Sequence, residues 1–203
     1  MKIGFFIEGL SYLDMARTLV ASARHVMPDV PIYQLTNSKC TAIDGVEVIR
    51  LGGAEIPMGT RRIMHYAALD GEWLFVGADV VFLKDVRHVF EKPFEIAMAS
   101  RDGTYLEGSD YARVMPYNFD VVFSRSPEFW KCVLEVMKKL PQEHQQWGGE
   151  QCVTGYLAKD ADLHVLPRFY NYTPETKDDP LKDVAVLHLK GKRKNWLPEL
   201  ART

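Results

Sequence analysis

Residues 73–83 read WLFVGADVVFL, an apolar run that contains a single acidic residue, Asp79. This composition is typical of a strand that is buried on both faces of a parallel or mixed sheet. Gly77 allows the backbone to bend, so the pattern predicts a strand over 73–76, a turn over 77–79 and a second short strand over 80–83. Asp79 would then lie at the carboxyl edge of the sheet, where ligands usually bind.

A carboxylate inside an apolar run needs a compensating partner, because burying an unpaired charge is costly. Two interpretations of Asp79 follow from the stretch itself. Its side-chain oxygen caps a turn or a short helix, or its carboxylate holds a ligand at the edge of the sheet. Other residues have to decide between the two.

Composition predicts one ordinary globular domain over residues 1–203, with 47% hydrophobic and 26% charged residues. The formal net charge of -2 argues against a field that recruits nucleic acid or an anionic membrane. No apolar run reaches the length of a membrane span, about 18 residues. The three cysteines lack metal-type spacing and favour a reducing compartment, so we expect a cytoplasmic location; they are Cys40, Cys132 and Cys152.

Strand and helix patterns alternate along the chain and predict an α/β fold, in which helices flank a mixed, mostly parallel sheet. Ser11, Thr60 and Ser126 each precede a helical pattern, and we interpret them as N-caps. Residues 101–116 are polar and aperiodic, which predicts a mobile loop that faces the substrate. Further strands are expected over 2–7, 31–35, 46–51, 94–100, 117–124, 163–166 and 184–189, and a short helix within 147–157.

Arg61 and Arg62 stand in the first turn of a predicted helix, where two cations oppose the helix macrodipole. Helix stability therefore does not explain them. They are either solvated side chains or groups that reach an anionic ligand, since the guanidinium fork suits phosphate oxygens.

His188 ends the last predicted strand and is followed by Lys190, Gly191 and further cations. A solvated basic tail is one interpretation of this segment. The other is a flexible turn that holds a diphosphate, while His188 and Asp79 share a divalent ion with its oxygens.

Five segments, in order along the chain, carry a resemblance. They are FVGADVVFL at 75–83, YNFDVVFS at 117–124, GEQ at 149–151, LPRFYNY at 166–172 and HLKGKRKNW at 188–196. They are similar to the D-x-D strand, the FNAGV segment, the DQ segment, the LP..YN stretch and the HxxGxxKPW ending of glycosyltransferase family 8, whose fold is the Rossmann-like GT-A fold. Asn195 stands where that ending has Pro. The matches run from about Ile3 to Trp196.

This resemblance implies transfer of a sugar, with retention of configuration, from a nucleoside-diphosphate sugar to an acceptor hydroxyl. UDP is the nucleotide expected, and Mn²⁺ or Mg²⁺ is expected on Asp79 and His188. The catalytic candidates, which would face the donor sugar or the acceptor, are Asp120, Glu150 and Gln151. The residues expected to bind the donor are Tyr12, Arg61, Arg62, Ala78, Asn118, Lys190, Gly191 and Lys194.

The first Asp of the D-x-D motif is Gly77 here, which leaves metal affinity and nucleotide choice open. One alternative is therefore a protein of the same fold that binds nucleotide sugars with weak catalysis or none. A second alternative is a sugar nucleotidyltransferase. Such enzymes usually carry a Gly-rich phosphate loop after the first strand, and EGLSYLD stands there instead.

Overall fold

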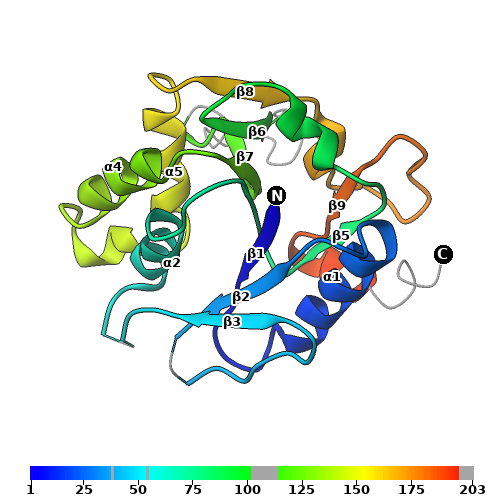
Figure 1. Ribbon diagram of the computed structural model, residues 1–203, viewed down its shortest axis with the longest axis horizontal. Helices are drawn as coiled ribbons and strands as arrows, with labels where there is room; N and C mark the ends of the chain where they lie inside the picture. Colours follow the sequence, from blue (N-terminus) through cyan, green and yellow to red (C-terminus); the bar gives the residue numbers. More distant parts are fainter. Residues whose placement is uncertain (38, 54, 102–113, 197–203) are drawn as a thin grey trace.

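The computed structural model describes residues 1–37, 39–53, 55–101 and 114–196, and Figure 1 shows their arrangement. The described strands are β1 (Lys2–Phe6), β2 (Ile32–Thr36), β3 (Glu47–Arg50), β4 (Trp73–Val76), β5 (Val80–Phe82), β6 (Ile96–Ser100), β7 (Tyr117–Ser124), β8 (Leu163–Leu166) and β9 (Val186–His188). Seven of them form one sheet in the order β3-β2-β1-β4-β7-β6-β8, and β5 and β9 form a second, two-stranded sheet.

The described α-helices are α1 (Leu13–Val26), α2 (Met58–Ala67), α4 (Pro127–Met137) and α5 (Gly149–Leu157). Short 3₁₀ helices connect the larger elements; these are η1 (Arg87–Glu91), η3 (Gln142–Gln145), η4 (Arg168–Asn171) and η5 (Gly191–Trp196). In the large sheet, β7 runs antiparallel to its neighbours β4 and β6, while every other pairing is parallel. The predicted α/β class with a mixed, mostly parallel sheet is confirmed.

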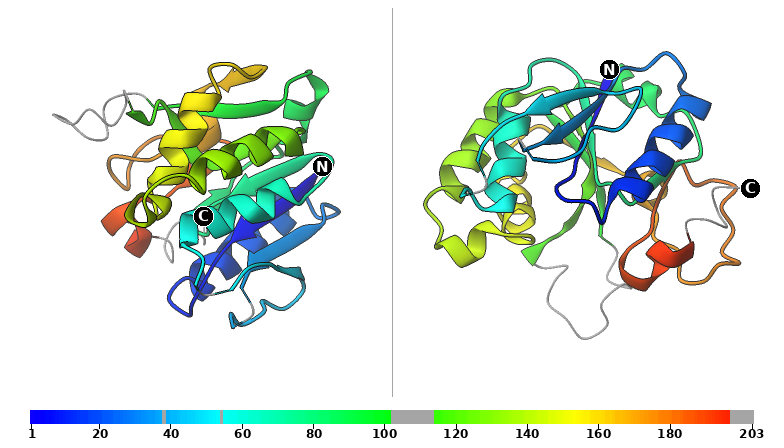
Figure 2. Two further views of the ribbon diagram at one scale, coloured as in Figure 1. Left: turned by 90° about the vertical axis from the view of Figure 1, so that its left-hand side faces the viewer. Right: turned by 90° about the horizontal axis from the view of Figure 1, so that it is seen from below.

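The large sheet is covered on both faces, and this explains the continuous apolar run of β4. Trp73 and Phe75 pack into one core with α2, α4 and α5, whereas Leu74 and Val76 pack into the other core with α1, β5 and β9. Figures 1 and 2 show α2, α4 and α5 on one side of the sheet and α1 with the small sheet on the other. The strand–turn–strand prediction for residues 73–83 is confirmed.

Two of the three predicted N-caps are wrong. Helix α1 begins at Leu13 after Tyr12, with no side-chain cap, so Ser11 lies outside the cap position. Helix α2 begins at Met58 after Pro57, so its cap position lies three residues before Thr60. Thr60 is therefore inside α2, and its hydroxyl donates to Gln145 Oε1 at 2.9 Å.

The cap of α4 is confirmed, because Ser126 Oγ accepts a hydrogen bond from the backbone N–H of Phe129 at 3.1 Å. The stretch expected as a substrate-facing loop, 101–116, lies mostly outside the described residues. Its two described ends meet, since the Arg101 N–H donates to the Pro116 carbonyl oxygen at 2.8 Å.

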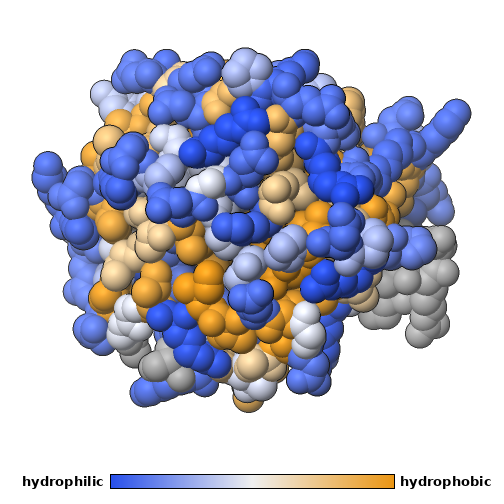
Figure 3. Space-filling view, in the orientation of Figure 1, coloured by the Kyte–Doolittle hydropathy of each residue, from blue (hydrophilic) through white to orange (hydrophobic). Residues whose placement is uncertain are grey.

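The surface is that of an ordinary globular protein, as the composition predicts (Figure 3). Hydrophilic side chains cover much of the face seen in Figure 3, and apolar residues gather toward its centre. Among the described helices, none is both long enough and apolar enough to cross a membrane. All three cysteines have free thiols; Cys40 is buried and Cys132 is exposed.

Candidate functional site

The topology brings three polar segments to one edge of the large sheet. Asp79 follows the carboxyl end of β4, and Asp120 lies near the start of the antiparallel neighbour β7, so both occupy the same edge. The small sheet adds His188, which pairs with Val80. The backbone N–H of Leu189 donates to the Asp79 carbonyl oxygen at 3.0 Å and joins the two segments.

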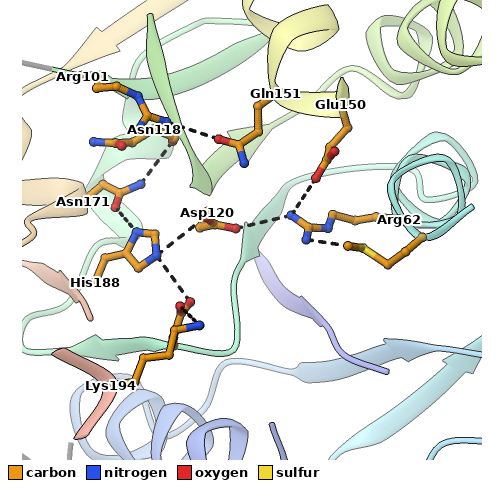
Figure 4. Close-up of polar contacts among 11 residues, drawn as sticks. Arg62, Arg101, Asn118, Asp120, Glu150, Gln151, Asn171, His188 and Lys194 are labelled. Carbon is orange, nitrogen blue, oxygen red and sulfur yellow. Dashed lines mark hydrogen bonds and ion pairs between the residues drawn. The ribbon is translucent and has the colours of Figure 1, made fainter. Parts of the chain in front are cut away.

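His188 is buried and held in one orientation. Its Nδ1 lies 2.8 Å from Asn171 Oδ1. Asn171 in turn donates from Nδ2 to the Asn118 carbonyl oxygen at 3.2 Å, which assigns Oδ1 as the acceptor for His188. His188 Nδ1 therefore donates to Asn171, and Nε2 faces two carboxylates, at 3.4 Å from Asp79 Oδ1 and 3.7 Å from Asp120 Oδ2 (Figure 4).

Two lysines from the segment after β9 complete this side of the site. Lys194 Nζ lies 2.9 Å from Asp79 Oδ2, and Lys190 Nζ donates to Asn118 Oδ1 at 2.7 Å. Burial alone would raise the pKa of Asp79, but His188 and Lys194 outweigh it and hold that pKa well below its usual range. Lys194 and His188 therefore compensate the charge of Asp79, as expected for a carboxylate in an apolar run. Because Lys190 and Lys194 contact residues of the site, they are not part of a solvated basic tail.

The donor atoms fit a divalent cation. Imidazole nitrogen and carboxylate oxygen are ligands that Mn²⁺ accepts, and carboxylate oxygen suits Mg²⁺. The hydrogen bond from His188 Nδ1 to Asn171 fixes the tautomer that a metal-binding imidazole needs. Within the described ranges, no group of three or more His, Cys, Asp or Glu side chains is arranged to hold a metal ion. A cation bound at Asp79 and His188 would thus need oxygen ligands from a bound molecule such as a diphosphate.

Arg62 lies in a second, more buried group of charges beside the first. Its Nη1 is 3.4 Å from Asp120 Oδ1 and 3.6 Å from Glu150 Oε1, and the Glu150 side chain is fully buried. Burial would lower the pKa of Arg62, but the charge of Glu150 above all raises it, so the guanidinium stays charged. For Glu150, burial outweighs the charge of Arg62 and raises the pKa of the carboxyl.

Arg61 points to a different partner. It pairs with Glu8 through two contacts, one of them 2.6 Å between Nη2 and Oε2, and it donates to the Gly53 carbonyl oxygen. Both Arg61 and Arg62 are buried, so the interpretation of these arginines as solvated side chains is wrong. Each is compensated by a carboxylate.

Two adjoining pockets open over these groups, with volumes of about 480 Å³ and about 160 Å³. The residues that line both are Tyr12, Asp79, Asp120, Trp147 and Lys194. The larger pocket is also lined by Gln151, His188, Lys190 and Gly191, and the smaller by Arg62 and Ala78. Ten of the thirteen residues predicted for the site therefore line this cleft.

The remaining three predicted residues lie behind the walls of the cleft and contact residues that line it. Arg61 holds Glu8, Asn118 holds Lys190, and Glu150 faces Arg62. The resemblance implies contact with the donor for Arg61 and Asn118, and a position facing the donor sugar or the acceptor for Glu150.

Several residues of the site were not predicted as members, and three of them have polar or exposed side chains that shape it. Asn171 orients His188, Trp147 is exposed at the mouth of both pockets, and Arg101 lines the larger pocket and donates to Gln151 at 3.3 Å. The signal for Asn171 was present in the LPRFYNY stretch, and the signal for Trp147 in the segment that precedes α5. Arg101 begins the stretch 101–116 that was expected to face the substrate, but nothing in that stretch singled out its side chain.

The fold matches solved glycosyltransferases. GlyE of Streptococcus pneumoniae TIGR4 is 16% identical with a TM-score of 0.71, over 100% of this chain and 60% of that protein. The galactosyltransferase LgtC, solved with donor and acceptor sugar analogs, is 14% identical with a TM-score of 0.69, over 100% and 95%. A glycosyltransferase involved in glycosylation of the major capsid of PBCV-1 is 16% identical with a TM-score of 0.64, over 99% and 98%.

No protein-family model and no curated protein sequence matches this chain. At such low identity the structural likeness establishes the fold alone. The chain spans 95% of LgtC but only 60% of GlyE. The chain therefore has the GT-A fold of the nucleotide-sugar glycosyltransferases.

Proposed function

We propose that this protein transfers a sugar from a nucleoside-diphosphate sugar to an acceptor hydroxyl. One observation carries the proposal: Asp79, His188 and Lys194, here called the cation cluster, meet at the edge of a GT-A sheet, with His188 Nε2 facing the Asp79 carboxylate. A UDP-sugar as donor and retention of configuration are parts of the proposal that rest on the resemblance to family 8. The solved complex of LgtC with donor and acceptor sugar analogs supports a donor site in this fold.

The reaction breaks the bond between the anomeric carbon and the diphosphate, and negative charge builds up on the leaving diphosphate. Lys194 and Lys190 line the larger pocket and are placed to stabilise that charge electrostatically. Asp79 and His188 would hold Mn²⁺ or Mg²⁺, which supplies Lewis-acid stabilisation of phosphate oxygens when bound. Asn171 keeps His188 in the tautomer that leaves Nε2 free to bind.

Arg62, Glu150 and Gln151, here called the buried cluster, support binding of the sugar. Within the described residues, Arg62 Nε, both Glu150 side-chain oxygens and Gln151 Nε2 are buried without a hydrogen-bond partner. Such groups are costly to leave unsatisfied. Sugar hydroxyls are both donors and acceptors and would satisfy Arg62 and Gln151, which line the cleft, whereas Glu150 lies behind them. Asp120 and Glu150 remain the carboxylates to test in the transfer step, with Gln151 beside them.

A second candidate is a protein that binds nucleotide sugars without transferring them. Gly77 favours it, because the position of the first D-x-D carboxylate carries no side chain. The two candidates differ in turnover and not in binding.

Donor hydrolysis tests the proposed transfer. Release of UDP from UDP-glucose, UDP-galactose and their N-acetylamino forms would be measured with Mn²⁺, with EDTA, and in His188→Ala. His25→Ala, on the exposed face of α1, is the matched control. We expect UDP release from at least one donor with Mn²⁺, loss of release with EDTA and in His188→Ala, and wild-type release in His25→Ala. Nucleotide binding without release from any donor would favour the second candidate.

A further inference from the structure

This inference rests on the proposed function and concerns the carboxylate that Gly77 does not supply. Gly77 and Asp120 face each other across β4 and β7. Val76 pairs with Val121 in the antiparallel register, and the Gly77 N–H donates to the Asp120 carbonyl oxygen at 3.0 Å. The two positions are therefore direct neighbours, although they are far apart in the sequence.

A side chain at position 77 would crowd the carboxylates beside it. A Cβ atom added to Gly77 would lie 2.9 Å from Asp79 Oδ1, 3.0 Å from Asp120 Cβ and 3.1 Å from Asp120 Oδ1. Carbon atoms in ordinary contact are about 3.5–4.0 Å apart. An acidic residue at 77 and another at 120 would also repel each other. In this chain the one side chain of the pair belongs to Asp120.

The Asp120 carboxylate points toward the cation cluster. Its Oδ2 is 3.7 Å from His188 Nε2, and its Oδ1 is 3.4 Å from Arg62 Nη1, so it lies between the cation cluster and the buried cluster (Figure 4). Asp120 lines both pockets, and its side chain is 18% exposed, which leaves an oxygen accessible from the cleft.

We propose that Asp120 supplies the charge of the missing first carboxylate of the D-x-D motif. From its place beside His188 it would strengthen cation binding at Asp79 and His188 without being a ligand itself, which agrees with the lack of a three-residue metal group among the described residues. Two departures from the family pattern then become one exchange: Gly77 stands where the D-x-D motif has Asp, and Asp120 stands where the FNAGV segment has Gly. The carboxylate has moved across the strand pair while its charge stays at the same edge of the sheet. This gives Asp120 a role in strengthening cation binding.

The test is Mn²⁺ binding in the presence of saturating UDP, measured by electron paramagnetic resonance of the free ion. Asp120→Asn keeps the shape of the side chain and removes its charge, so we expect at least about a tenfold loss of Mn²⁺ affinity. Asp120→Gly should lose as much. The double variant Gly77→Asp/Asp120→Gly moves the carboxylate back across the strands, and we expect it to recover most of the affinity.

Asp14→Asn is the matched control, because it removes an exposed carboxylate on α1 that pairs with Arg17 and does not line the cleft. Its Mn²⁺ affinity should stay at the wild-type value. Wild-type affinity in Asp120→Asn would overturn this inference alone and leave the proposed function intact. Failure of the folded double variant to recover affinity would also overturn it. If the wild-type protein binds neither UDP nor GDP with Mn²⁺, the proposed function fails as well.

Discussion

The cation cluster and the buried cluster lie side by side but differ in how their charges are satisfied. In the cation cluster, Asp79 has cationic or imidazole partners at 2.9 and 3.4 Å, and Lys194 is 30% exposed. In the buried cluster, the fully buried Glu150 faces Arg62 at 3.6 Å, and its oxygens have no hydrogen-bond partner among the described residues. The first is already satisfied within the protein, whereas the second has polar atoms left for a ligand.

The difference predicts a large loss of stability when the cation of the buried cluster is removed and a small loss when Lys194 is removed from the cation cluster. Arg62→Met leaves Glu150 buried without a countercharge, and we expect it to lower the free energy of unfolding by about 3–5 kcal/mol. Lys194→Met should lower it by less than about 1 kcal/mol, because the pair with Asp79 is partly exposed to solvent. Urea denaturation of both variants measures the contrast.

A double variant sharpens this result. Arg62→Met/Glu150→Gln removes the buried charge together with its partner, so it should recover part of the stability lost in Arg62→Met. Equal losses in Arg62→Met and Lys194→Met would contradict the distinction between the two clusters.

Asn171 lies outside the cation cluster but affects its Mn²⁺ binding indirectly, because it orients His188. Asn171→Ala removes the acceptor that fixes the His188 tautomer and should weaken Mn²⁺ binding with UDP by about 10–100-fold. Asn171→Asp keeps an acceptor for Nδ1 and should retain more of the affinity. The His188 ring ¹⁵N shifts report the tautomer directly. An unchanged tautomer and unchanged Mn²⁺ affinity in Asn171→Ala would show that this hydrogen bond does not position His188.

Helix α2, which carries Arg62, also carries the buried His65, and we expect this histidine to make stability depend on pH. Burial, with the charge of Arg61 nearby, lowers the pKa of His65 from 6.5 to about 4. The unfolded chain therefore binds this proton first as the pH falls, and stability is lost between about pH 6.5 and pH 4. At pH 5 the loss relative to pH 7 should be about 2 kcal/mol.

Urea denaturation at pH 7 and pH 5 measures this loss, and His65→Leu is the comparison because it cannot be protonated. The stability of His65→Leu should fall less over this interval than that of the wild type. The same pH dependence in both proteins would assign the loss to other groups.

Local patterns predicted much of the fold because a strand that is buried on both faces is apolar at every position, which can be recognised in the sequence. The limits of β4 and β7 and the Ser126 cap were all readable from apolar composition and cap chemistry. Thr60 misled because its hydroxyl serves a tertiary contact with Gln145, which no local pattern reveals.

A residue of the site could be predicted where it differs chemically from the residues next to it in the sequence. Asp79 stands out as a lone charge in an apolar run, and His188 as the end of a strand before a basic turn. The partners of Arg61 and Arg62 were not predictable, since Glu8 and Glu150 reach them only through the fold. The neighbourhood of Gly77 and Asp120 likewise depends on the β4–β7 register.

The most direct test of the central claim is calorimetric titration of UDP into the protein with Mn²⁺. The titration would be repeated with EDTA, with GDP, and in Asp79→Ala and His188→Ala. The account predicts UDP binding that requires Mn²⁺ and is lost in both variants, while both variants remain folded by circular dichroism. UDP binding that is indifferent to EDTA and to both substitutions would contradict the cation site at Asp79 and His188.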